Sequence, residues 1–104
     1  MELVVYWTVF AEDKLNDIFE YYKFTAGVRV AQKLINGIVD SSFELDKNPY
    51  GGQKEELLKD RVQEYRYIIF KSYKIIYWID ETNKMIIVSH VFDTRRNPEK
   101  LNKI

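Results

Sequence analysis

The sequence of 104 residues contains no cysteine and only one histidine, His90. A disulfide bond is therefore impossible, and the usual zinc sites are excluded because they need several thiolate or imidazole ligands. We expect neither a bound metal nor another cofactor. The lack of cysteine is also compatible with the reducing environment of the cytosol.

Long apolar runs are absent as well. No segment approaches the roughly 20 apolar residues that a membrane-spanning helix requires. The first five residues, Met-Glu-Leu-Val-Val, lack the basic start of a signal peptide. We therefore expect a soluble, cytoplasmic protein that makes no contact with a membrane.

The chain also lacks net charge, because 16 basic and 16 acidic side chains balance one another. This balance argues against general nucleic-acid binding. The charges are nevertheless unevenly placed: residues 1–65 contain eight Lys or Arg and twelve Asp or Glu, whereas residues 66–104 contain eight and four. The second part is thus suited to an anionic partner, unless the charges are merely clustered by chance on a solvated surface.

Apolar residues make up 46% of the chain and aromatic residues 15%. A chain of this length and composition is typical of one domain with a dense core, so residues 1–104 are predicted to form a single domain.

The spacing of the apolar residues predicts the element order β-α-α-β-β-β. Thr8 is a suitable N-cap for the first helix and Gly27 separates the two helices. This order indicates an α+β fold in which an antiparallel helical hairpin packs on one face of an antiparallel sheet. The expected strands span 3–7, 62–70, 73–80 and 84–92, and the expected helices span 9–25 and 28–46.

The strand at 73–80 is apolar on both faces, as expected for the centre of the sheet. Its alternation places Ile75, Tyr77 and Ile79 on one face, and Ile76 and Trp78 on the other.

The second helix carries more apolar surface than one buried stripe requires. Val39 and Phe43 flank its main stripe. This flank either packs on the sheet or receives a partner protein.

Few residues suggest catalysis. His90 is expected inside a strand with Val88 and Phe92 on the same face, which is more typical of a structural histidine than of a general base. The pair Gly51-Gly52 lacks the spacing and the following lysine of a phosphate-binding loop.

Basic residues of the last third are the stronger candidates for a binding site. Arg66, Lys71, Arg95 and Arg96 could converge near one face of the sheet. Converging guanidinium groups recognise phosphates or carboxylates through paired hydrogen bonds. The alternative is ordinary surface charge, with Arg66 paired to an acid of the domain such as Asp93.

Several motifs together resemble the RelE/ParE superfamily of bacterial toxins. The likeness covers nearly the whole chain in the correct order of elements. It lies in Trp7-Thr8 followed by Ala11 and Leu15, in Tyr65-Arg66 followed by Tyr73-Lys74-Ile75-Ile76-Tyr77, and in the closing Val91-Phe92-Asp93-Thr94-Arg95-Arg96-Asn97-Pro98.

This resemblance implies the toxin of a type II toxin–antitoxin system, a class linked to plasmid stabilisation. Its cognate antitoxin would wrap the toxin with an extended segment, for which Val39 and Phe43 are candidate contacts. Operator DNA would be bound only through the antitoxin. A homodimer, or a heterotetramer with the antitoxin, is compatible with this arrangement.

The superfamily divides by target. RelE-like members cleave mRNA on the ribosome with basic residues and usually a Tyr or His near the C-terminus, whereas ParE-like members act on DNA gyrase. The tail after Phe92 contains neither Tyr nor His. We therefore predict a gyrase-binding toxin that is not an enzyme, with Arg66, Lys71, Arg95 and Arg96 contacting the target.

Two alternatives remain open. The first is a ribosome-dependent mRNA endonuclease in which His90 joins these four basic residues in catalysis. The second is a degenerate module that only binds its antitoxin and acts in autoregulation of the operon.

Overall fold

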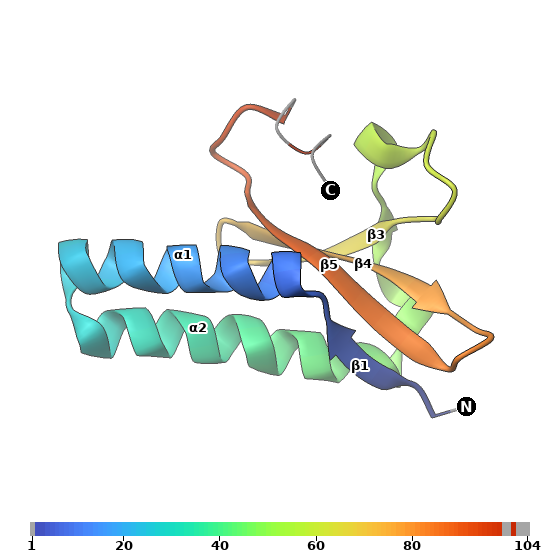
Figure 1. The fold of residues 1–104 in the computed structure, drawn as a ribbon, viewed down its shortest axis with the longest axis horizontal. Helices are drawn as coiled ribbons and strands as arrows, with labels where there is room; N and C mark the ends of the chain where they lie inside the picture. Colours follow the sequence, from blue (N-terminus) through green and yellow to red (C-terminus); the bar gives the residue numbers. More distant parts are fainter. Residues whose placement is uncertain (1, 99–100, 102–104) are drawn as a thin grey trace.

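The computed structural model describes residues 2–98 and residue 101, so residues 99–100 and 102–104 of the tail lie outside the description. It contains a small sheet, two long helices and three short 3₁₀ turns (Figure 1). No helix among these residues is long and apolar enough to cross a membrane. In chain order the elements are β1 (Val4–Trp7), α1 (Val9–Ala26), α2 (Val28–Phe43), η1 (Glu44–Lys47), η2 (Pro49–Gly51), β2 (Gln53–Lys54), η3 (Glu56–Leu58), β3 (Arg66–Phe70), β4 (Tyr73–Asp80) and β5 (Met85–Asp93).

The five strands are arranged in the order β1-β5-β4-β3-β2. Strands β2 to β5 pair antiparallel, and β1 pairs with β5 in parallel. The predicted α+β fold and the central position of β4 are confirmed. The sheet is nevertheless mixed. After the helical hairpin the chain enters the sheet at the edge strand β2, opposite to β1, and then runs back strand by strand to β5. Strand β5 therefore comes to lie beside β1 and pairs with it in parallel.

Local signals set the boundaries of the helices. Thr8 caps α1 by accepting a hydrogen bond from the backbone N–H of Ala11 at 3.1 Å. Gly27 ends the helix with a φ of 99°, which glycine adopts without strain. Helix α2 ends at Phe43, three residues before the predicted end, and continues as the 3₁₀ turn η1.

Two further differences concern the segment before β4. Strand β3 begins at Arg66 instead of residue 62, and its partner β2 was not predicted. The side chain of Val62 is 99% exposed. Val62 favours a strand by its residue type but has no neighbouring strand with which to pair. Strand β2 has two residues and pairs only with Arg66 and Tyr67.

The main core lies between the helical hairpin and the sheet. Ile75 and Tyr77 of β4 pack there with Ile38 of α2, and Ile79 joins them at the periphery. The Nε1 of Trp7 donates a 3.0 Å hydrogen bond to Oγ of Ser42, which connects β1 to α2. The predicted common face of Ile75, Tyr77 and Ile79 is therefore confirmed, and it meets the helices.

A second, smaller apolar cluster covers the opposite face of the sheet. Leu58, Ile76, Phe92 and Leu101 are buried there, with Tyr67 packed against them. The segment around η3 and the chain after β5 supply its cover. This face of the sheet is consequently occupied in part by the chain itself, and Ile76 lies on the face opposite to Ile75 and Tyr77, as predicted.

Replacing Ile75 with alanine should lower the free energy of unfolding by about 2–5 kcal/mol, because its fully buried side chain would leave a cavity. Urea denaturation measures the change. The matched control is Ile69→Ala on β3, where the side chain is 53% exposed and the expected loss is under about 1 kcal/mol. Equal midpoints for Ile75→Ala and the unmodified chain would contradict the position of β4 in the core.

Candidate functional site

The predicted basic residues occupy two ends of the sheet. Arg66 pairs with Tyr77 near one end of β4, whereas Lys71 lies in the β3–β4 turn at the other end. Arg95 and Arg96 follow β5, whose last residue pairs with Tyr73 beside that turn. The structure thus brings Lys71, Arg95 and Arg96 to the same end and places Arg66 roughly four strand residues, or about 13 Å, away.

Arg66 has a structural environment. Its Nη1 donates to the backbone carbonyls of Tyr50 at 3.1 Å and Gly52 at 3.0 Å, and its Nη2 lies 3.1 Å from a carboxylate oxygen of Glu64. The side chain is only 15% exposed. Arg66 therefore holds the turn η2 against β3, and its acidic partner is Glu64 instead of the Asp93 considered from the sequence.

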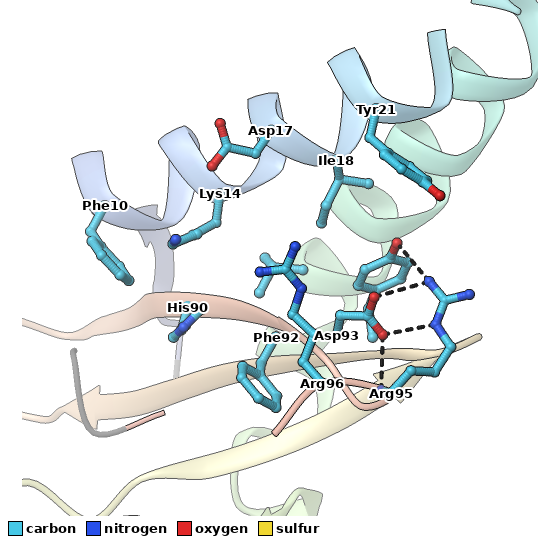
Figure 2. A pocket seen from close by; sticks show the side chains of 12 residues that line it. Phe10, Lys14, Asp17, Ile18, Tyr21, His90, Phe92, Asp93, Arg95 and Arg96 are labelled. Carbon is cyan, nitrogen blue, oxygen red and sulfur yellow. Dashed lines mark hydrogen bonds and ion pairs between the residues drawn. The ribbon is translucent and has the colours of Figure 1, made fainter. Parts of the chain in front are cut away.

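Arg95 lies at the centre of a polar cluster. Its Nε and Nη2 donate to the two carboxylate oxygens of Asp93 at 2.9 and 3.0 Å, in the paired geometry typical of arginine (Figure 2). Its Nη2 also donates to the hydroxyl groups of Tyr22 at 3.2 Å and Tyr73 at 3.4 Å. One guanidinium group therefore connects α1, β4 and the end of β5.

This cluster changes the acidity of its members. Hydrogen bonds from Tyr73 and Arg95 lower the pKa of Tyr22, whereas burial raises the pKa of Tyr73. The hydrogen bond from Arg95 likewise lowers the pKa of Asp93. The sequence did not identify Tyr22 as a site residue, because 73 residues separate it from Arg95. Its polar hydroxyl at the edge of an apolar stripe was the only available signal.

The start of the tail is anchored to the β3–β4 turn. The backbone N–H and the hydroxyl of Thr94 both donate to the carbonyl of Ser72 at 2.8 Å. The backbone N–H of Arg96 donates to the carbonyl of Asp93 at 3.0 Å. The positions of Arg95 and Arg96 are thereby held relative to the end of the sheet.

A cavity of about 610 Å³ lies between α1 and the end of β5. Figure 2 shows the side chains of α1 above it and those of β5 and the tail below, with Arg96 extending into the space between them. The cavity is lined by Phe10, Lys14, Asp17, Ile18, Tyr21, Tyr73, His90, Val91, Phe92, Asp93, Arg95 and Arg96.

His90 forms part of this lining and is only 4% exposed. The strand pairing shifts here, since Ile76 pairs with His90 while Tyr77 pairs with Val88. Ser89 is therefore the extra residue of a β-bulge. The bulge turns Val88 into the main core and leaves His90 beside Phe92, so the predicted common face of His90 and Val88 is wrong.

The environment of the imidazole is apolar and cationic. The rings of Phe10 and Phe92 meet it edge to face at 5.1 and 5.6 Å between centroids. Burial, with a further contribution from the charge of Lys14, lowers the pKa of His90 to about 4. Its Nδ1 has no hydrogen-bond partner among the residues described. At neutral pH the ring is therefore uncharged and has an unsatisfied polar atom.

The predicted antitoxin contacts lie elsewhere, on α2. Phe43 is 54% exposed and Val39 is half-buried. Both remain accessible at the surface of the chain. Within residues 2–98 and 101, no group of three or more His, Cys, Asp and Glu side chains is placed to hold a metal ion.

Comparisons with known proteins agree with this fold. A family model described as "ParE toxin of type II toxin-antitoxin system, parDE" matches residues 5–98. A solved structure described as "Chromosomal ParDE TA system from P. aeruginosa" superposes with a TM-score of 0.72 at 17% sequence identity. The superposition covers 88% of this chain and 95% of that chain, which shows a shared fold. The comparison with curated protein sequences gave no match.

The buried imidazole predicts a dependence of stability on pH. Between pH 6.5 and 4 the unfolded chain binds a proton at His90 that the folded chain does not bind. Stability should therefore be complete above pH 6.5 and decrease toward pH 4, by up to about 3 kcal/mol from this group. Urea denaturation at pH 7.5 and 4.5 measures the loss.

The variant His90→Leu should lose less stability over the same interval, because it has no imidazole to protonate. The quantity to compare is the change with pH within each protein, since the substitution also alters packing. An equal pH-dependent loss in both proteins would contradict the burial of a neutral His90.

Proposed function

Because the chain belongs to the ParE toxin family of type II toxin–antitoxin systems, we propose that it inhibits growth by binding DNA gyrase. Gyrase is the target that ParE-like toxins of the superfamily share. The end of the sheet formed by Lys71, Arg95 and Arg96 is the proposed contact surface. A cognate antitoxin neutralises the toxin in this proposal and carries any contact with operator DNA.

The observation that carries this proposal is the position of Arg96. It extends from the anchored start of the tail and makes no ion pair with any of the residues described. Arg95, in contrast, already binds Asp93. An arginine without an internal acid retains its full capacity for a bidentate contact with a carboxylate or phosphate of a partner. Arg96 and Lys71 thus supply target contacts, while Arg95 holds the surface in place.

The environment of His90 supports binding over bond cleavage. A general acid or base must reach the group with which it exchanges a proton. His90 is buried between two phenylalanine rings and uncharged at neutral pH. With a pKa of about 4 it carries no charge at neutral pH and is a weak base there, so it is poorly matched to catalytic proton transfer.

One observation favours the alternative of a ribosome-dependent mRNA endonuclease. Tyr22 has a lowered pKa and lies within hydrogen-bonding distance of Arg95. A tyrosine beside a guanidinium group could transfer a proton next to a phosphate, which would replace the absent tyrosine or histidine of the tail. The assays below are therefore designed to separate the two mechanisms.

The proposed antitoxin surface includes the exposed flank of α2. Phe43 and Val39 offer apolar area that the main core does not cover completely. An antitoxin segment that folds on binding would bury this area against its own apolar side chains.

We expect Arg96→Gln to relieve growth inhibition in cells and to reduce inhibition of gyrase supercoiling by about tenfold, because one charged contact is lost. The matched control is Lys84→Gln in the β4–β5 turn, at the end of the sheet opposite to Arg96, and this variant should retain full activity. Both variants should keep the unfolding midpoint of the unmodified chain, because exposed charges contribute little to folding.

The same proteins should be tested for mRNA cleavage on programmed ribosomes. Codon-positioned cleavage by the unmodified chain, abolished by Tyr22→Phe, would overturn the gyrase proposal and support the endonuclease. Absence of both activities would contradict both mechanisms and support a module that only binds its antitoxin.

Phe43→Asp should weaken binding of the co-expressed antitoxin by at least about tenfold, since a charge replaces exposed apolar area. Co-purification and calorimetry measure the binding. Val62→Asp, at a fully exposed site in the loop before β3, is the control and should bind normally. Normal binding by Phe43→Asp would remove this side chain from the proposed interface.

A further inference from the structure

The cavity between α1 and β5 has features of a ligand site beyond the proposed gyrase contact. Its volume of about 610 Å³ is within the usual range for small-ligand pockets. It shares Arg96 with the proposed target surface, but its remaining lining residues are not part of that surface apart from Arg95.

Cationic side chains enter the cavity from opposite walls. Lys14 comes from α1 and Arg96 from the tail, and neither forms an ion pair within the described part of the chain (Figure 2). The lining also holds the Arg95–Asp93 pair, which is internally neutral, and the single acid Asp17. With His90 uncharged, the lining has one net positive charge, which matches a monoanion.

His90 provides the second, independent indication of a ligand. The residue is only 4% exposed. Its ring lies against Phe10 and is close enough to Lys14 to be affected by the ammonium charge. A buried nitrogen without a hydrogen-bond partner costs roughly 1–3 kcal/mol, and Nδ1 of His90 is such an atom. A neutral imidazole can carry its proton on Nδ1 and donate it to a ligand oxygen.

Apolar side chains surround these polar groups. Phe10 and Ile18 come from α1, and Val91 and Phe92 from β5. They suit an aromatic or aliphatic body attached to the anionic group, as in most small-ligand sites. Asp17 on the same wall would repel a second negative charge, so a dianionic phosphate fits less well than a carboxylate.

We propose that this cavity binds a single carboxylate attached to an apolar or aromatic group, with Lys14, Arg96 and Nδ1 of His90 as its hydrogen-bond donors. The carboxylate comes either from an acidic side chain of a peptide or from a small aromatic acid. Both sources present the same chemistry to the site.

The test is an NMR titration of the ¹⁵N-labelled chain at pH 7, in which the His90 imidazole nitrogens and the backbone amides of α1 and β5 are followed. The small probes are 3-phenylpropionate, its uncharged analogue 3-phenylpropanol, and phenyl phosphate. The peptide probes are N-acetyl-glutamyl-phenylalanine amide and its glutamine analogue. Tighter binding of the peptide identifies a protein source, and tighter binding of 3-phenylpropionate identifies a small acid.

The two carboxylates should bind with a Kd on the order of 1 mM, as expected for probes of this size, and should shift the resonance of Nδ1 of His90. Lys14→Met and Arg96→Gln should each weaken binding about tenfold, because each removes a charged donor. Lys23→Met, on the same helix but outside the cavity, is the matched control and should bind like the unmodified chain.

Three outcomes would overturn the proposal. They are equal binding of the acid and the alcohol, tighter binding of phenyl phosphate, and the absence of any shift at His90. Because the readout is binding to the purified chain, such a failure leaves the gyrase proposal intact. Conversely, a chain without gyrase activity can still bind the carboxylate.

Discussion

The burial of β5 on both faces is the constraint on which the rest of the structure depends. This strand pairs with β1 on one side and β4 on the other, and α1 packs along it. The bulge at Ser89 allows Val88 and Val91 to face the helices while Phe92 packs with Ile76 on the opposite side. His90 lies between the rings of Phe10 and Phe92. Without the extra residue, the side chains after it would exchange faces, and a histidine would enter the main core.

The end of β5 carries the polar cluster around Arg95. Asp93 holds Arg95, and Arg95 in turn binds the hydroxyl groups of Tyr22 and Tyr73. Adjacent arginines thereby acquire different roles. Arg95 is part of the framework that joins α1, β4 and the tail, whereas Arg96 extends into the neighbouring cavity and is available to a ligand or partner. The two residues are equivalent in the sequence and differ only in what surrounds them.

The surroundings of His90 and Tyr22 change their acidity, which bears on whether either residue could act in catalysis. A histidine in a chain with no other imidazole is a natural candidate for proton transfer, yet burial between Phe10 and Phe92 lowers its pKa far below neutral pH. The pKa of Tyr22 is also lowered, but by hydrogen bonds from Tyr73 and Arg95 that stabilise its ionised form. In the proposed function, Tyr22 and Arg96 are therefore the residues whose substitution best separates gyrase binding from mRNA cleavage.

The sequence alone determined the order of the long elements and the boundaries of the helices at Thr8 and Gly27. It also determined that β4 is apolar on both faces. These features follow from local periodicity and capping, which act over a few residues. The family was also visible from short motifs in the correct order. Tertiary structure decided the parallel pairing of β1 with β5, the bulge at Ser89, the separation of Arg66 from Lys71, and the meeting of Tyr22 with Arg95. Each of these depends on contacts between segments far apart in the chain. The local pattern of apolar and polar residues contains no information about which distant segment a strand or side chain will contact.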